Sequence, residues 1–325
     1  MRVLLAGASG TLGIPLTRGL IERGHHVLGL TRHPAGAQAL STIGATPIVA
    51  DALDRDALLR ALDGRAADAI VNELTALKKA PARHSGMALT NRLRIEGSAN
   101  LLAAADLTGA TRFVTQSIIF GYGYRDHGST VLTEGDPFGE PAGTKTDPHV
   151  AAMRSAEEQA LTAPEGIALR YGVLYGGDGG QLQALLARRR VPVANGGLLG
   201  WVHHHDAATA TIAAIERGVA GEAYNVVDDQ PASWREMITA MADAFDAPRP
   251  WAVPGWLMRL AAPYLASFAV DTSMRVSNEK AKRQLGWRPA FATYPHGVVA
   301  MASAARPDGA RSASSLVNES KRGHA

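Results

Sequence analysis

Several residue types and patterns are scarce or missing in this chain of 325 residues. It has no cysteine, which excludes disulfide bonds, thiol catalysis and thiolate metal sites. No uninterrupted apolar run reaches the roughly 18 residues of a membrane span, and the N-terminus shows no charged-then-apolar leader. We therefore expect a cytoplasmic protein with no membrane association.

A strong charge of either sign is also missing. The formal net charge is +3, and the basic residues are scattered except for the triplet at 188–190. We interpret this triplet as the solvated end of a helix rather than a nucleic-acid patch, and we expect no nucleic-acid partner. The content of hydrophobic residues, 46%, is enough for a large buried core.

The most informative segment is the N-terminal one, where an apolar run breaks into glycines. Gly7, Gly10 and Gly13 follow a short apolar strand and precede leucines at helical spacing. Gly7 allows a tight turn, Gly10 lets the backbone approach a pyrophosphate, and Gly13 lets the helix pack against the strand. The alternative is a plain glycine-rich turn in a parallel sheet. We predict a dinucleotide-binding turn formed by Gly7, Ser9, Gly10, Thr11, Leu12 and Gly13.

A second apolar strand, residues 26–31, ends in Arg32 rather than in an acid. An acidic residue there would hold a free ribose 2′-hydroxyl, whereas an arginine suits a 2′-phosphate. We therefore expect NADPH (NADP) rather than NAD(H), unless Arg32 only solvates the strand end. Asp51, after a third apolar strand at 46–50, is better placed to cap a helix or to touch the adenine amine.

Further apolar strands alternate with helical stretches, at 69–71, 112–115 and 166–170. This alternation predicts an α/β fold, a Rossmann-type doubly wound parallel sheet with a smaller C-terminal substrate lobe. We expect residues 1–170 to form the NADP-binding Rossmann lobe, with 203–227 returning to it. Residues 171–202 and 228–305 would form the small substrate or lid lobe. The stretch 306–325, rich in Ser, Gly and Arg, is expected to be a disordered tail.

Several separated segments resemble the extended, epimerase-like branch of the short-chain dehydrogenase/reductases, over roughly residues 1–300. The family implies a Rossmann lobe for NAD(P) and a C-terminal lobe that closes over the substrate. The resemblance adds Ala52, Leu74, Ser117, Tyr171 and Val173 to the expected cofactor residues. The matching segments are 7–13, Thr90-Asn91, 112–114 leading to Tyr122-Gly123, 169–170 leading to 173–176, 201–203 leading to Asp206, Tyr224-Asn225, and Lys282 leading to 285–289.

The resemblance also indicates where the family's chemistry should lie. Family members use a Tyr with a Lys four residues later on one helix face, plus a Ser or Thr that polarises the substrate oxygen. In this chain these three positions are His149, Met153 and Ile118, the last beside Ser117. Met153 has no charge to lower a neighbouring pKa, so the family mechanism is lost. Ser117 and His149 remain weak catalytic candidates, and His149 is otherwise only a histidine near a helix start.

The run from His203 to Asp206 invites a metal interpretation. Consecutive residues on an extended segment alternate faces, which leaves at most His203 and His205 on one side. We expect no metal, because no other ligand cluster is evident. The resemblance makes Asp206 a structural carboxylate that follows a strand.

Two functions are compatible with the changed family positions. One is an NADPH-dependent ketoreductase for a polycyclic aromatic polyketide in antibiotic biosynthesis, whose substrate hydroxyl or solvent supplies the proton; the chain is similar to actinobacterial reductases that act on an angucyclinone carbonyl. The other is a non-catalytic NADP(H)-binding regulator or sensor. A sugar-nucleotide epimerase would need bound NAD and a restored acid. The residues expected to contact a polycyclic substrate, if they do not simply pack the small lobe, are Tyr175, Trp251, Trp256 and Met258. Tyr264 and Phe268 add to the flat, flexible surface of the same lobe.

Overall fold

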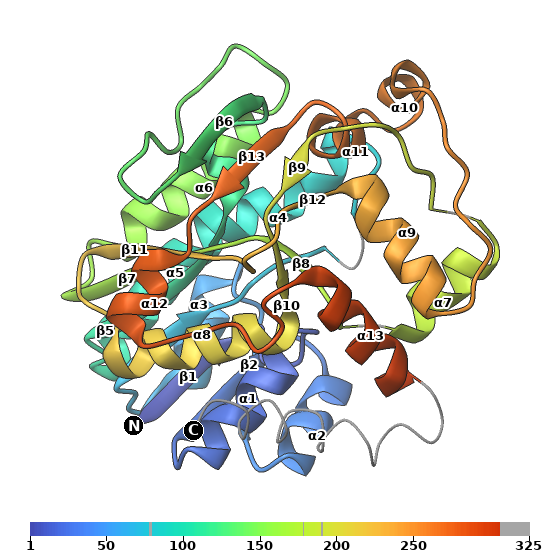
Figure 1. Ribbon diagram of the computed structural model, residues 1–325. Helices are drawn as coiled ribbons and strands as arrows, with labels where there is room; N and C mark the ends of the chain where they lie inside the picture. The colour runs from blue at the N-terminus through green and yellow to red at the C-terminus, as the bar shows by residue number, and fades with distance from the viewer. Residues whose placement is uncertain (78–79, 178, 190, 306–325) are drawn as a thin grey trace.

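The computed structural model describes residues 1–77, 80–177, 179–189 and 191–305. The tail expected at 306–325 lies outside the described residues. Seven parallel strands form the central sheet in the order β11-β7-β5-β4-β1-β2-β3 (Figure 1). This topology confirms the predicted α/β, Rossmann-type sheet. The strands are β1 (Arg2–Ala6), β2 (His26–Thr31), β3 (Thr46–Val49), β4 (Ala69–Asn72), β5 (Arg112–Ile118), β7 (Glu165–Tyr171) and β11 (Glu222–Val226).

Helices cover both faces of the sheet, because alternate strand residues point to opposite sides. Along β1, Val3 and Leu5 join one apolar cluster, whereas Leu4 and Ala6 join another. The first cluster includes residues of α1 (Gly13–Glu22), α2 (Pro34–Thr42), α8 (His204–Arg217) and α12 (Glu279–Leu285). The second includes residues of α3 (Arg55–Leu62), α5 (Ser98–Thr108) and α6 (Asp147–Ala160).

A long helical segment leads into α5. It begins with a 3₁₀ turn, His84–Met87, continues as α4 (Ala88–Arg92) and then widens into a π-helical turn, Leu93–Gly97. It ends at Gly109, whose φ of +75° is in the left-handed region. π-Helices are rare, occur mostly as single turns inside α-helices, and are frequent at functional sites.

The other strands form three small pairs beside the carboxyl end of the sheet. These are β8 (Val173–Tyr175) with β10 (Trp201–His203), β9 (Leu198–Leu199) with β12 (Ala232–Ser233), and β6 (Asp126–Leu132) with β13 (Ser273–Val276). The remaining helices are α7 (Gly179–Ala187), α9 (Trp234–Ala244), α10 (Gly255–Ala261), α11 (Pro263–Ala269) and α13 (Tyr294–Ala305). Their apolar side chains share a third core cluster, which is rich in methionine and aromatic residues.

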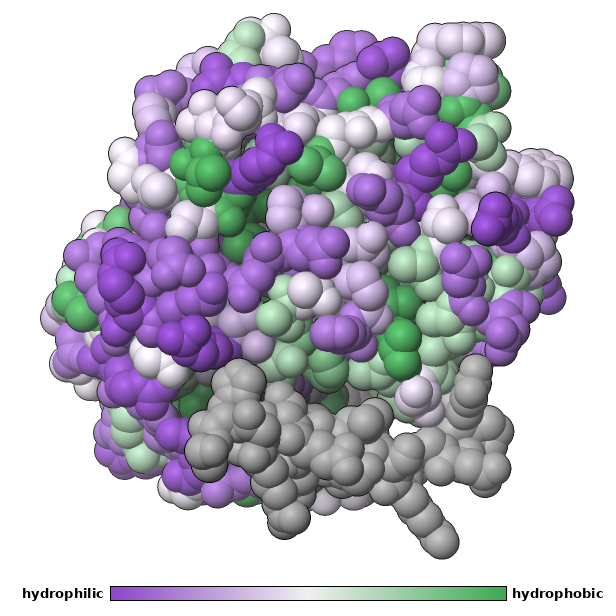
Figure 2. Space-filling view, in the orientation of Figure 1, coloured by the Kyte–Doolittle hydropathy of each residue, from purple (hydrophilic) through white to green (hydrophobic). Residues whose placement is uncertain are grey.

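The helices in the described part of the chain are all too short or too polar to cross a membrane. Hydrophobic side chains nevertheless reach the surface where α10 lies, at the upper right of Figure 2. In this helix Trp256, Leu257 and Leu260 are exposed, and Met258 alone is buried.

Candidate cofactor and substrate site

The glycine turn after β1 is compact and leaves no room for a side chain at Gly7 or Gly13. Gly7 has a φ of +86°, and a Cβ added there would lie 2.6 Å from the carbonyl oxygen of Glu73. A Cβ at Gly13 would overlap the carbonyl oxygens of Gly7 and Ala8. At Gly10 the added Cβ would meet only the Gly7 oxygen. The turn therefore brings strand and helix together and leaves the backbone beside Gly10 open, which suits a pyrophosphate.

The ends of β2 and β3 lie next to this turn. The Ser9 hydroxyl is 3.0 Å from that of Thr31, the last residue of β2, and the Arg32 side chain that follows is exposed. Asp51 accepts the Leu53 N–H at 2.9 Å, with Ala52 buried beside it. Of the two roles expected for Asp51, the helix cap is wrong, and the contact with the adenine amine stays a prediction.

The helix cap lies three residues further on. Asp54 accepts the Ala57 N–H at 3.0 Å and so begins α3. An acidic residue directly before the first helical turn satisfies an N–H that the helix itself leaves free.

The remaining expected cofactor residues lie at the carboxyl ends of β4, β5 and β7 and on β8. Two polar side chains hold the backbone of Leu74. Its N–H donates a hydrogen bond to Asn72 Oδ1 at 3.2 Å, and its carbonyl oxygen accepts one from Gln116 Nε2 at 2.6 Å. Ser117 is buried, and its hydroxyl has no partner among the described residues. Tyr171 ends β7, and Val173 begins β8. Since the carboxyl ends of parallel strands share one sheet edge, these residues and the glycine turn line the same edge.

Glu73, which the sequence interpretation missed, is buried at the centre of this edge. Tyr171 donates its hydroxyl to Glu73 Oε1 at 2.7 Å, and the same hydroxyl lies 2.6 Å from that of Thr211. Glu73 Oε2 has no partner among the described residues. Burial raises the pKa of Glu73 to about 8, so the carboxyl is mostly protonated at neutral pH. The sequence signal that could have revealed Glu73 is an acidic residue directly after an apolar strand.

His149, at the family's Tyr position, is buried near the start of α6. Its Nε2 lies 3.0 Å from His84 Nδ1, and its Nδ1 lies 2.9 Å from the Asn91 amide nitrogen. Its ring stacks on that of His84 and meets the edge of Tyr264. Burial, and then the charges of His84 and Arg94, lower the pKa of His149 to about 4. His149 is therefore a neutral imidazole at neutral pH and carries no imidazolium proton to donate.

We call this group of six side chains the His149 cluster: His84, Asn91, Arg94, Tyr124, His149 and Tyr264. The Tyr124 and Tyr264 hydroxyls are 3.2 Å apart. Of the other family positions, Met153 is packed in the apolar core and Ile118 is partly buried at the end of β5. No sequence signal connects His84 with His149, because the two residues are far apart along the chain and meet only through the fold. Tyr264 is predicted only as part of the aromatic surface of the small lobe, and the structure adds its contact with His149.

The four expected substrate residues occupy different environments. Tyr175 is buried against His203 and Trp201, and its hydroxyl has no partner among the described residues. Met258 is buried in the core. Trp251 and Trp256 project to solvent, with 61% and 65% of their surface exposed. The structure therefore does not gather these four side chains around one point.

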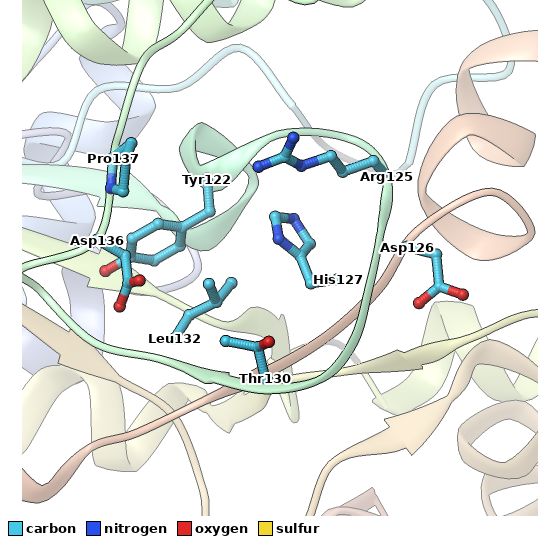
Figure 3. Close-up of a pocket in the computed structure, with 8 residues that line it drawn as sticks. All are labelled: Tyr122, Arg125, Asp126, His127, Thr130, Leu132, Asp136 and Pro137. Atoms are coloured by element: carbon cyan, nitrogen blue, oxygen red, sulfur yellow. The ribbon is translucent and has the colours of Figure 1, made fainter.

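A small pocket of about 300 Å³ lies under the turn that leads into β6. Figure 3 shows Arg125 and His127 pointing into it and Asp126 pointing away. The Tyr122 ring forms one wall, while its hydroxyl donates to Asn225 at 2.8 Å and accepts Arg170 at 2.9 Å. Polar and apolar side chains both line the pocket, and none of them belongs to the expected cofactor or substrate residues.

The histidine run is not extended, which corrects the sequence interpretation. β10 ends at His203 and α8 begins at His204, because His203 Nδ1 accepts the His205 N–H at 3.2 Å and so caps the helix. Asp206 accepts the N–H groups of Ala290 and Phe291 at 2.7 and 3.0 Å and holds the chain that leads to α13. Across the described residues, no three His, Asp or Glu side chains are grouped to hold a metal ion.

The sheet order, the glycine turn at the carboxyl end of β1 and the second group of elements over that edge define a dinucleotide-binding protein of Rossmann type. The chain belongs to the NAD dependent epimerase/dehydratase family, which it matches over residues 3–227.

Curated relatives of the chain include several reductases. It is 35% identical to a 3-diazoavenalumate denitrifying reductase of a Streptomyces species, over 92% of this chain and 99% of that one. It is 26% identical to a 4-hydroxy-2-methyl-3-oxo-4-farnesyl-3,4-dihydroquinoline-1-oxide ketoreductase of Stigmatella aurantiaca, over 88% and 92% of the two chains.

Among solved structures, the fold is similar to DesIV, a dTDP-glucose 4,6-dehydratase of Streptomyces venezuelae. The TM-score is 0.75 at 21% identity, over 93% of this chain and 96% of that one. The family and the reductase relatives together indicate an oxidoreductase with a nicotinamide cofactor.

Proposed function

We propose that this protein is an NADPH-dependent ketoreductase that reduces a carbonyl of a polycyclic aromatic polyketide. The observation that carries the proposal is the neutral, buried His149 at the position where the family places its acid. A reductase of this kind needs a substrate that stabilises its own developing alkoxide. A phenol beside a ketone or quinone carbonyl does so through an internal hydrogen bond. The reductase relatives support the reaction class.

The glycine turn and the sheet edge offer the groups that this cofactor requires. The backbone beside Gly10 would hold the pyrophosphate, and Arg32, with the hydroxyls of Ser9 and Thr31, would hold the 2′-phosphate. Asp51 and Ala52 would lie by the adenine, and Leu74, Ser117, Tyr171 and Val173 toward the nicotinamide. When bound, the cofactor would supply a hydride to the carbonyl carbon, while a proton from the substrate hydroxyl or from solvent completes the alcohol.

A second candidate substrate is an aromatic diazo compound, as the name of the Streptomyces relative suggests. An aryl diazonium that accepts a hydride gives the arene and N₂, so no proton is needed. This reaction is therefore equally compatible with a site that lacks an acid. In this reaction the ring carbon that bears the diazonium group, rather than a carbonyl carbon, would accept the hydride.

The test is consumption of NADPH, followed by its nicotinamide absorbance. The acceptors are phenolic polyketide ketones and quinones, each paired with its O-methylated analogue, and a phenolic aryl diazonium salt. We expect consumption with the free phenols that is lost on methylation, and His149→Phe should still consume NADPH with the free phenols. Consumption that survives methylation but is lost in His149→Phe would contradict substrate-supplied protonation.

Two other results would redirect the proposal. Consumption with the diazonium salt alone, with release of N₂, would favour the second candidate. Tight NADPH binding without consumption of any acceptor would refute both and favour a non-catalytic NADP(H)-binding regulator.

A further inference from the structure

Arg94 is a buried arginine without a partner. It lies on the π-helical turn Leu93–Gly97, is 8% exposed, and forms no hydrogen bond or ion pair with any described residue. The other buried arginine among the described residues, Arg170, pairs with Glu157 at 2.8 Å. Removing a charge from water without compensation is costly. The unpaired guanidinium at Arg94 therefore implies an anion that is not part of the described chain.

The surroundings of Arg94 offer it no negative charge. The groups whose electrostatic effect reaches it are the phenols of Tyr124 and Tyr264. Burial raises the pKa of both phenols, so both are neutral at neutral pH. His149, which feels the charge of Arg94, is neutral as well. The His149 cluster thus carries a positive charge that no carboxylate of the described residues balances.

Aromatic rings and a second unsatisfied polar atom adjoin this charge. Phe120 stacks on Tyr124 with ring centroids 4.9 Å apart, and Phe268 packs against Tyr264 at 5.8 Å. The Asn91 amide oxygen is buried and accepts no hydrogen bond from the described residues. The arrangement suits a flat ligand that carries an oxyanion and a hydrogen-bond donor.

We propose that Arg94 binds a carboxylate of the aromatic substrate through its guanidinium fork, with the tyrosine hydroxyls of the His149 cluster beside it. The inference rests on the proposed function, because it takes the His149 cluster as the place where the aromatic acceptor binds. A guanidinium matches the two oxygens of a carboxylate, which gives orientation as well as affinity. The charge would thereby fix which end of the substrate faces the cofactor.

The test compares binding of 6-hydroxy-2-naphthoate with that of its methyl ester, by calorimetry on the NADP-bound protein without turnover. We expect the acid to bind the wild type more tightly than the ester does. Arg94→Met should weaken binding of the acid about ten- to a hundredfold and leave the ester unchanged, as expected for loss of a charged hydrogen-bonded pair. Arg94→Lys should give an intermediate loss. The matched control is Arg92→Met on the same helix, an exposed arginine paired with Glu96, which should change neither ligand's binding.

Thermal unfolding without ligand tests whether Arg94 is instead a structural residue. We expect Arg94→Met to unfold at the same or a higher temperature than the wild type, because an uncompensated buried charge is removed. A marked fall in the unfolding temperature would overturn the proposal, as would equal binding of acid and ester by the wild type. Competition by inorganic phosphate as strong as by the naphthoate would also overturn it and indicate a phosphate site. This experiment measures binding and not turnover. Its result therefore does not depend on whether the protein has the proposed reductase activity.

Discussion

The buried carboxyl of Glu73 makes a prediction about how stability depends on pH. Its pKa is about 8 in the folded protein against an ordinary 4.5, because it is desolvated. The folded state therefore holds a proton that the unfolded state releases, and the free energy of unfolding falls as pH rises through this window. At about 1.36 kcal/mol for each pKa unit, the full effect is roughly 5 kcal/mol as an upper limit.

The perturbation is Glu73→Gln, which keeps an oxygen to accept the Tyr171 hydroxyl and removes the titration. We expect the variant to gain stability relative to wild type as pH rises, with most of the gain between about pH 5 and about pH 9. Urea unfolding at several pH values measures it, and the difference between the two proteins cancels the other titrating groups. Glu140→Gln, at an exposed position, is the control and should show no such trend. A difference that stays flat across this range would refute the assignment of a protonated Glu73.

Two further predictions concern the cofactor preference and a buried ion pair. Arg32→Asp should weaken NADPH binding about ten- to a hundredfold and affect NADH binding much less, because the substitution removes a charged partner of the 2′-phosphate. Fluorescence titration measures both affinities, and equal losses for the two cofactors would argue against this role of Arg32. Glu157→Ala should cost about 3–5 kcal/mol of unfolding free energy, because it leaves the buried Arg170 unpaired. The double variant Glu157→Leu with Arg170→Met should lose much less, and urea unfolding of both variants decides the comparison.

The Rossmann sheet could be predicted because its signals are local. Apolar runs and glycine spacing predict the strand at residues 26–31 and the glycine turn before α1, and the structure has both. The sequence predicts a helix cap at Asp51, whereas the structure has it at Asp54. Only hydrogen-bond geometry distinguishes these neighbouring aspartates. The histidine run was interpreted as extended because its sequence gives no indication that His203 caps a helix.

The His149 cluster could be predicted only in part. His149 was placed by the family's helix pattern, but its stacking on His84 and Tyr264 depends on three segments that the fold brings together. Arg94 carries no sequence signal that separates it from an ordinary exposed helix arginine such as Arg92. Its significance lies in burial without a partner, and a sequence does not record burial.

The pairing of β6 with β13 has a consequence for how the chain is made. Asp126 pairs with Ser273, so β6 must wait for its partner strand until the chain has been synthesised as far as β13, Ser273–Val276. The neighbouring strands β1 to β5 can meet much earlier, because all of them precede residue 119. Contacts between distant segments form slowly, and domains form in the order in which they leave the ribosome. During synthesis the nucleotide-binding edge would therefore exist for some time before the segments that cover it, and a truncation before β13 would leave β6 without its partner strand.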